Sequence, residues 1–183
     1  LVYLKTYPLQ QYHSALFGLA QGKTSELVKA LKPVLDKTLT EMGCMPSSSP
    51  EEIQKMLEQM QAEAVTVDAT ERPIPRATDY GVQEEFYSGK KKEHTVKNNM
   101  LATDWQEVVY LSPTHEGKKH DKKICDEEQY QFPEGIILRQ DNGYKGYQPE
   151  GVVIQQPFKS SKKHPLTLEQ KLHNKIVSAK RVV

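Results

Sequence analysis

The chain has 183 residues, with 25 Lys plus Arg against 24 Asp plus Glu, so its formal net charge is +1 at pH 7. With 37% hydrophobic and 27% charged residues it has the composition of an ordinary soluble domain that can build one core. The absence of an apolar run of about 18 residues excludes a transmembrane helix, and two cysteines are too few for a disulfide framework or a four-cysteine zinc site.

The N-terminal part of the chain is predicted to be helical. Apolar residues recur at the helical period over 9–19. A second helix is predicted over 24–31, and Pro33 should break or bend it because the residue before a proline avoids the α region. The helical pattern continues over 34–42 and ends at Gly43, a natural C′ residue.

Two short helices joined by residues 17–22 have the dimensions of a helix-turn-helix. In that motif the second helix enters the major groove, and its first residues contact bases and phosphates. The candidate DNA-contacting residues at this position are Gln21, Lys23, Thr24, Ser25 and Lys29. The same pattern also fits a small helical cap on a core, so both interpretations stay open.

The remaining elements predict an α/β core behind the helical head. A capping box at Ser49 opens a helix over 50–63, the β-rich run 64–67 ends at Asp68, and residues 73–85 read as an irregular excursion. The later elements are, in order, a hairpin of two strands, a helix, two further strands and a helix opened by a second capping box: 93–101 and 107–111, 120–129, 135–139, 152–155, and 167 to the chain end.

Charge is unevenly distributed along the chain. Residues 41–71 carry seven acids, residues 159–181 carry seven bases, and two shorter basic clusters lie at 90–92 and 118–123. A local basic surface can bind a polyanion through counterion release even when the whole chain is nearly neutral. The alternative is a solvated helix face with lysine-rich loops.

Two aspartates follow strand-like runs, Asp68 and Asp141. Carboxylates at the ends of adjacent strands can hold Mg²⁺, which prefers oxygen ligands, and a third acid would allow two ions to be held. From spacing alone turn capping is the favoured interpretation of each aspartate, since Asp-Asn-Gly at 141–143 is turn chemistry. Asp121 is a third candidate that is more typical of a helix N-cap. Glu71 is close enough in sequence to approach Asp68, but it is interpreted as a neighbour in the excursion.

Five blocks carry a family resemblance. They are, in chain order, VDATERPIPR at 67–76, YSGKKKEHTVK at 87–97, His120-Asp121, DNGYKGY at 141–147, and a last block with Pro157-Phe158-Lys159, 166–169, 174–178 and Arg181-Val182-Val183. Together they resemble DDE transposases of the bacterial insertion-sequence type related to Harbinger elements. The head, with 15–18 and Ser25, is similar to the helix-turn-helix that precedes this catalytic domain.

The resemblance implies an α/β fold, a ribonuclease-H-like mixed sheet with flanking helices, preceded by a helix-turn-helix head. The implied domains are a DNA-binding head over 1–45, a linker and helix over 46–63, and an endonuclease domain over 64–183. The implied function is a DNA transposase of an insertion sequence, which hydrolyses phosphodiesters at the element ends and joins the freed 3′-OH to target DNA.

The resemblance also assigns the acids. Asp68 maps to the first acid and Asp141 to the second, because the strand before Asp141 would run beside the Asp68 strand; Asp121 has a weaker claim to the second place. Two Mg²⁺ ions are implied, for which Mn²⁺ can substitute. The third acid of the family, a Glu, follows the Arg-Val-Val stretch, and this chain stops at Val183. We therefore expect a chain truncated at both ends, whose own enzymatic activity is open.

The expected partners are the terminal inverted repeats and the target DNA, together with a possible second copy of the chain in a homo-oligomer, and no membrane. Basic residues would hold phosphates, which position the DNA without reading its sequence; these are Lys90, Lys91, Lys92, Lys162, Lys163, Lys175 and Arg181. The expected location is the bacterial cytoplasm, at the nucleoid. Two other functions stay open: a catalytically dead fragment that only binds DNA, and a helix-turn-helix regulator with an unrelated α/β domain.

Overall fold

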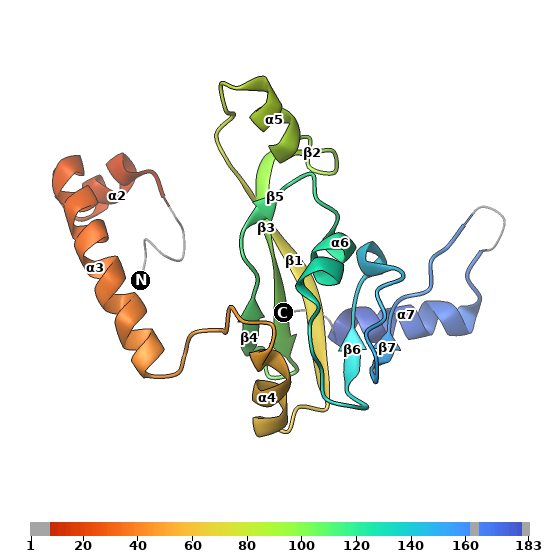
Figure 1. Ribbon diagram of the computed structural model, residues 1–183. Helices are drawn as coiled ribbons and strands as arrows, with labels where there is room; N and C mark the ends of the chain where they lie inside the picture. Colours follow the sequence, from red (N-terminus) through yellow and green to blue (C-terminus); the bar gives the residue numbers. More distant parts are fainter. Residues whose placement is uncertain (1–7, 162–164, 181–183) are drawn as a thin grey trace. The chain divides into compact units, whose positions relative to one another are not determined.

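The computed structural model describes residues 8–161 and 165–180. The chain divides into two units, the first ending at Met45 and the second beginning at Pro46, and each is described by itself (Figure 1). Within the described ranges no helix combines the length and the apolar character that crossing a bilayer requires.

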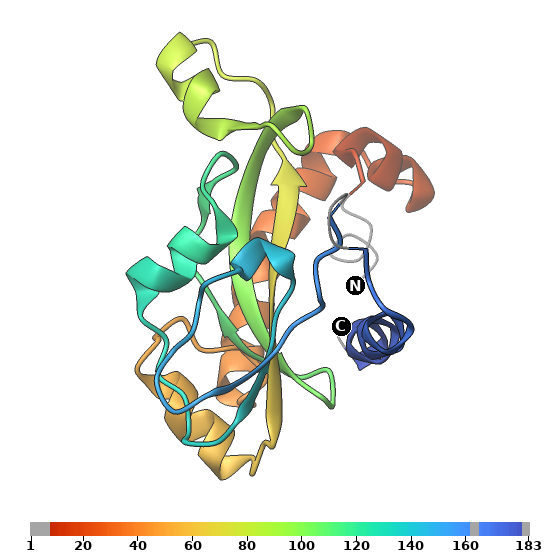
Figure 2. The ribbon, with the colours of Figure 1, turned by 90° about the vertical axis from the view of Figure 1, so that its right-hand side faces the viewer.

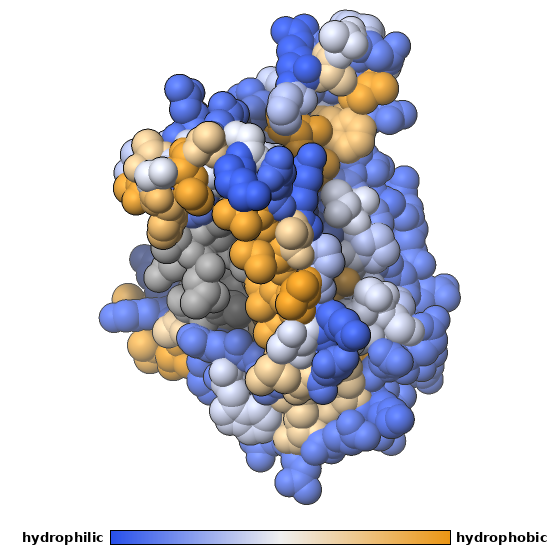
Figure 3. All heavy atoms as spheres, turned by 90° about the vertical axis from the view of Figure 1, so that its left-hand side faces the viewer, coloured by the Kyte–Doolittle hydropathy of each residue, from blue (hydrophilic) through white to orange (hydrophobic). Residues whose placement is uncertain are grey.

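The first unit, called the head below, is a pair of helices, α2 (Gln10–Leu16) and α3 (Gln21–Glu41). Its described residues bury little: Ser14 and Thr24 are the buried positions of the two helices. Apolar side chains lie exposed instead, and Figure 3 shows hydrophobic side chains along α3. The exposed large hydrophobic residues of the helices and their connection are Leu9, Tyr12, Leu16, Phe17, Leu19, Leu27, Leu31 and Val34.

The second helix was expected to break or bend at Pro33, and the break is wrong, because α3 continues through this residue. A proline inside a helix removes one backbone hydrogen bond but leaves the bonds of the neighbouring turns. An ion pair between Lys32 Nζ and Asp36 Oδ2, at 2.6 Å, spans the proline. The predicted end of the helix is confirmed, since Gly43 follows the C-cap with a φ of 67°, which glycine adopts without strain.

The second unit, called the sheet unit below, is built on a mixed sheet with β1 (Ala64–Pro73) at its centre. β1 pairs antiparallel with β3 (Glu93–Thr103) on one side and parallel with β6 (Ile137–Arg139) on the other. β7 (Val153–Gln155) adds to β6 in parallel. Three shorter strands pair with β3, namely β2 (Tyr87–Ser88), β4 (Val108–Leu111) and β5 (His115–Glu116). The predicted α/β class is confirmed.

Helices flank this sheet. Figure 2 shows α6 (Asp121–Glu128) on one face and α7 (Leu168–Lys180) on the other side. The predicted capping box of α7 is confirmed, because Gln170 N donates to Thr167 Oγ1 at 3.2 Å while Thr167 N donates to Gln170 Oε1 at 3.1 Å. The helix expected over 50–63 is shorter, as α4 (Glu52–Gln59), and the excursion contains a helix that was not predicted, α5 (Tyr80–Phe86).

The core of the sheet unit lies between the strands and the helices α4 and α6. Val65 and Val67 of β1 pack in one cluster with Leu101 and Leu138 of the neighbouring strands, and α4 contributes two fully buried residues to it, Ile53 and Leu57. Each such side chain stabilises the fold by about 1.5–3 kcal/mol relative to exposure. The segment before β1 is therefore an integral part of this core, which fixes the strands that carry the acids.

Candidate functional site

Asp68 lies half-way along β1. The strand was expected to end at this residue, but β1 is ten residues long and continues to Pro73. The reason is the pairing partner: β3 stays in antiparallel register with β1 from Val65 opposite Thr103 to Pro73 opposite Thr95. Asp68 is half-buried, and its Oδ1 accepts a hydrogen bond from Ala69 N at 2.9 Å.

Asp141 follows β6, the strand that lies beside β1. Thr66 of β1 and Arg139 of β6 form the last pair of the parallel register between these two strands. Asp68 and Asp141 each come two residues after this pair, so they follow it side by side. Asp141 is the N-cap of a 3₁₀ turn over 142–144, and its Oδ1 accepts from Gly143 N at 2.6 Å. The strand arrangement expected from the sequence is confirmed, and the turn-capping role of Asp141 exists alongside it.

Both aspartates line one cavity of about 250 Å³. Its wall contains four carboxylates, Asp68, Glu71, Asp121 and Asp141, and its lysines are Lys90, Lys97, Lys118 and Lys119. The cavity thus collects residues from β1, β3, the segment before α6 and the turn after β6. A cavity with mixed acids and lysines can hold a divalent cation together with an anionic ligand.

The backbone at Gly143 brings two of these carboxylates to one point. A Cβ atom at this residue would lie 2.8 Å from Asp141 Oδ1 and 3.3 Å from Asp121 Oδ2, so no side chain fits without displacing them. Asp121 therefore lies on the same side of the cavity as Asp141. The expectation that Asp121 caps its helix is wrong, because the N-cap of α6 is His120 and Asp121 is its first helical residue.

Asp121 forms an ion pair that the sequence did not predict. Lys97 Nζ lies 3.0 Å from Asp121 Oδ1 and also donates to the carbonyl oxygen of Lys119 at 2.8 Å. The Lys97 side chain is 9% exposed. In the sequence Lys97 belongs to a family block, and the available signal was a lysine inside a strand-like run; the register that places it opposite Glu71 comes from the structure.

Glu71 is also engaged by its neighbours. Its Oε1 accepts a hydrogen bond from Thr95 Oγ1 at 2.6 Å. Burial alone would raise the pKa of Glu71, but hydrogen bonds from Ser88 and Thr95 together with the charges of Lys97 and Lys91 outweigh it and hold that pKa below its usual value. Glu71 is therefore a charged acceptor that ties β1 to β3 and to the segment at Ser88. It lies within β1 and not in the irregular segment that follows this strand.

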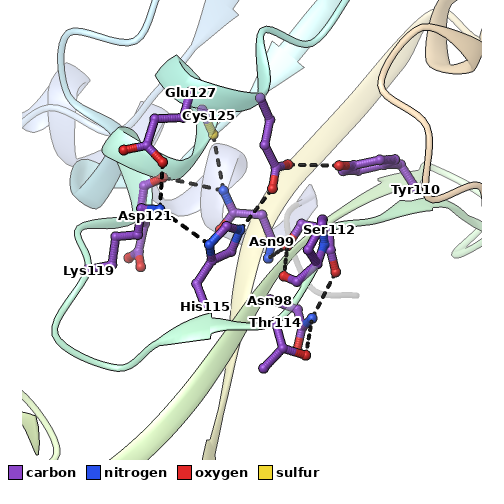
Figure 4. Close-up of polar contacts among 12 residues, drawn as sticks. Asn98, Asn99, Tyr110, Ser112, Thr114, His115, Lys119, Asp121, Cys125 and Glu127 are labelled. Atoms are coloured by element: carbon purple, nitrogen blue, oxygen red, sulfur yellow. Dashed lines mark hydrogen bonds and ion pairs between the residues drawn. The ribbon is translucent and has the colours of Figure 1, made fainter. Parts of the chain in front are cut away.

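A buried polar network joins β3 to α6, whose first residue is the cavity acid Asp121 (Figure 4). Asn99, which is fully buried on β3, donates through Nδ2 to the carbonyl oxygen of Asp121 at 3.3 Å and to Cys125 Sγ at 3.2 Å. Its Oδ1 accepts from Tyr144 Oη at 3.2 Å. Burial first, and then the neighbouring Cys125 sulfur and the cavity acids, raise the pKa of the Tyr144 hydroxyl. The network ties α6 and the turn after β6 to the same strand.

The carboxylates fit a hard divalent cation by their chemistry. Mg²⁺ is commonly held by one or two protein carboxylates while it keeps several waters, and Asp68 and Asp141 supply such oxygens on adjacent strands. In the ranges 8–161 and 165–180, three or more His, Cys, Asp or Glu residues do not converge into a site that could hold a metal. Asp68 and Asp141 thus offer two carboxylates beside an open cavity.

The basic clusters differ in how far their charges are paired. Lys90, Lys91 and Lys92 lie exposed in the turn between β2 and β3, and among the described residues none of them forms an ion pair within 4.0 Å. The cluster at 118–123 is paired instead, with Glu84, Asp126 and Glu127 as its partners. The turn at 90–92 is thus the basic segment beside the cavity that is open to an anionic partner.

The expected DNA-contacting residues of the head lie at the start of α3. Gln21, Lys23 and Lys29 are exposed, and Lys23 pairs with Glu26 of the same helix. Thr24 is 3% exposed, so its hydroxyl is turned away from any ligand of this surface. Ser25 is half-buried, and on α7 Lys175 is exposed. Three further expected phosphate contacts lie outside the described residues: Lys162, Lys163 and Arg181.

Comparison with known proteins adds independent evidence. Residues 67–183 match the family described as DDE superfamily endonuclease. The chain is also 26% identical, over 173 residues, to the probable transposase for insertion sequence element IS702 from Microchaete diplosiphon. That alignment covers 94% of the chain and 60% of the relative, so the chain spans less than two thirds of the relative's length. No solved structure matches the chain.

Proposed function

The chain belongs to the DDE superfamily endonucleases, and from this premise we propose that it acts in DNA transposition, as the nuclease part of an insertion-sequence transposase. The substrate is DNA at the ends of the element, where a phosphodiester is hydrolysed and the freed 3′-OH attacks target DNA. The observation that carries the proposal is that Asp68, within β1, and Asp141, just after the adjacent parallel strand β6, line one cavity.

The fold proposed for the sheet unit is ribonuclease-H-like. Three features support it: the central position of β1, the antiparallel partner β3 on one side, and the parallel strands β6 and β7 on the other. The family match, which begins at Val67 and so includes Asp68 of β1, supports the same assignment.

In this proposal Asp68 and Asp141 hold the metal ions. Two Mg²⁺ ions, when bound, supply an activated attacking oxygen and stabilise the leaving oxygen. The chain's own residues orient these ligands: Gly143 N donates to Asp141 Oδ1, and pairing with β3 on one side and β6 on the other fixes the backbone of β1. Mn²⁺ suits the same oxygen donors and serves as the laboratory substitute.

Around the cavity, the exposed lysines of the 90–92 turn would hold the phosphate backbone. Such contacts position DNA without reading its sequence. The head would read the element ends as a helix-turn-helix; the exposed side chains of Gln21, Lys23 and Lys29 at the start of α3 support this role. A protein with this substrate belongs at the bacterial nucleoid.

The test uses a labelled duplex carrying the DNA that flanks this reading frame, incubated with the chain and Mn²⁺. Cleavage at the element end should fall about a hundredfold or more in Asp68→Asn and in Asp141→Asn, because each change removes a carboxylate that holds an ion worth several kcal/mol of transition-state stabilisation. Asp126→Asn is the matched control, since Asp126 pairs with Lys122 on α6 and does not line the cavity.

The outcomes separate the candidate functions. Cleavage that survives both active-site substitutions would overturn the proposal. Binding of the flanking DNA without any cleavage would instead support a chain that only binds DNA. A mobility shift with a Lys90→Ala, Lys91→Ala, Lys92→Ala triple variant tests the phosphate contacts separately, and its affinity should fall with a shallower salt dependence than that of the unmodified chain.

A further inference from the structure

Lys97 carries a buried charge inside the cavity. It lies on β3, and the residue is 7% exposed. A buried ammonium is unfavourable unless it is paired and hydrogen-bonded. Lys97 meets both conditions, through Asp121 Oδ1 at 3.0 Å and the carbonyl oxygen of Lys119 at 2.8 Å. The environment of this lysine is therefore specific, unlike that of a surface lysine.

The two partners of Lys97 lie at the start of α6 and in the segment before it. Asp121 is the first residue of α6, and its own carbonyl oxygen accepts from Asn99 Nδ2 at 3.3 Å. Two residues of β3, Lys97 and Asn99, thus hold the first turn of α6 through its side chain and its backbone. The Asp121 carboxylate cannot turn toward Asp68 without breaking the bond to Lys97.

Glu71, another acid of the cavity wall, is hydrogen-bonded as well. Glu71 lies opposite Lys97 in the β1–β3 register and accepts from Thr95 Oγ1 at 2.6 Å. The lysine therefore acts on both carboxylates: it pairs with Asp121, and its positive charge helps to hold the pKa of Glu71 below its usual value. A carboxylate whose charge is offset in this way attracts a divalent cation less strongly.

We propose that Lys97 is a positioning residue, which holds Asp121 in an ion pair and so leaves Asp68 and Asp141 as the carboxylates that take up the metal ions. This inference rests on the proposed function, because it concerns the same ions. It also decides between the two candidates for the second acid in favour of Asp141. The carboxylate of Asp121 then fixes α6 at the cavity wall, with its Oδ2 facing Gly143.

The experiment measures Mn²⁺ binding to the full chain by titration followed with electron paramagnetic resonance. Asp141→Asn should weaken binding about tenfold or more, because ligand charge sets the affinity of such sites. Asp121→Asn should weaken it clearly less than Asp141→Asn does, because it removes no metal ligand and acts only through the charge of the unpaired Lys97. Lys97→Met, which frees the Asp121 carboxylate, should tighten binding severalfold, and Lys97→Met/Asp121→Asn should lose that gain.

The matched control is Lys123→Met. Lys123 is also paired, with Glu127 at 3.8 Å, but it does not line the cavity and its side chain is 67% exposed, so its removal should leave the binding curve unchanged. Lys97→Arg should restore unmodified binding, since a guanidinium can keep both the carboxylate and the carbonyl as acceptors. This rescue separates a positioning role from a loss of folding.

The results that would overturn the inference are distinct from those that would overturn the proposed function. If Asp121→Asn weakens Mn²⁺ binding as much as Asp141→Asn does, Asp121 is a ligand and Lys97 does not hold it back. This comparison decides the matter even where Lys97→Met does not fold. If neither Asp68→Asn nor Asp141→Asn changes Mn²⁺ binding, or if the unmodified chain binds none, the metal site itself is wrong.

Discussion

The head and the sheet unit place their apolar side chains in opposite ways. In the sheet unit, strands far apart in sequence bury Val65, Leu101 and Leu138 completely in one cluster. In the head, Leu31 and Val34 of α3 are 62% and 61% exposed. The helices of the head are therefore supported mainly by local contacts, whereas the sheet unit is supported by non-local ones. Only the second arrangement can hold a buried charge such as Lys97 in place.

The same contrast applies to ion pairs. Lys23 and Glu26 in the head are 3.1 Å apart, and both side chains are mostly exposed. Lys97 and Asp121 in the sheet unit are 3.0 Å apart, and both are largely buried. Similar distances thus describe a weak surface contact in one region and a fixed element of a cavity in the other, because burial decides how strongly solvent screens the charges.

The largest expected difference between the two regions comes from truncating leucines. Leu138→Ala removes a fully buried side chain from β6 and should lower the free energy of unfolding by about 2–5 kcal/mol. Leu31→Ala truncates a side chain that is 62% exposed and should change stability by less than about 0.5 kcal/mol. Urea denaturation measures both. Equal losses would show that the exposed face of α3 is covered in solution.

Glycine substitutions should have opposite signs in the two regions. A Cβ at Gly117 would lie 2.0 Å from Thr95 Oγ1 and 2.7 Å from Thr95 O, so Gly117→Ala should cost about 1–3 kcal/mol through overpacking. Gly22 in α3 has no heavy atom within 4 Å of such a Cβ, and Gly22→Ala should stabilise by about 0.5–1 kcal/mol. Thermal denaturation reports both signs; a neutral Gly117→Ala would contradict the close approach of this loop to β3.

These contrasts also explain what the sequence could predict. Local patterns predicted elements correctly where the cause is local: the capping box of Thr167 and Gln170 forms, and Gly43 ends α3. The apolar run before Asp141 correctly predicted a strand beside β1. Even so, α3 passes through Pro33, where a local rule had predicted a break or a bend, and the break is absent.

Features that depend on a distant partner were not predicted. β1 continues past Asp68 because β3 pairs with it, and nothing in the residues around Asp68 encodes that register. The ion pair of Lys97 and Asp121 joins residues 24 positions apart and depends on where α6 lies above the sheet. The acids of the cavity could thus be named from the sequence, while the contacts that position them could not.

A smaller effect should follow from removing single hydroxyl groups. Tyr144→Phe deletes the donor to Asn99 Oδ1 at 3.2 Å and leaves a fully buried acceptor without it, which should cost about 1 kcal/mol or slightly more. Thr24→Val in the head removes a buried Oγ1 that has no hydrogen-bond partner among the described residues, so it should be neutral or stabilising. Urea midpoints compare the two. A destabilising Thr24→Val would mean that its hydroxyl is bonded in solution.

The smallest effect concerns pH and Glu71. Burial disfavours the charged carboxylate, but the hydrogen bonds from Ser88 and Thr95 and the charges of Lys97 and Lys91 hold the pKa of Glu71 below its usual value of 4.5. Because the folded pKa is the lower one, the unfolded chain takes up the proton first as the pH falls. The stabilisation by Glu71 is therefore fully present above pH 4.5 and is lost as the pH falls through the folded value.

Glu71→Gln removes this dependence and should flatten the acid limb of the plot of melting temperature against pH. The stability at stake should be below about 1 kcal/mol, because Glu71 is only half-buried and solvent screens its charge. Thr95→Val, which deletes one hydroxyl donor to Glu71, should shift the acid limb to higher pH without removing it. An acid limb that is as steep in Glu71→Gln as in the unmodified chain would show that other carboxylates carry the pH dependence, and that Glu71 does not anchor β1 to β3 as an ion.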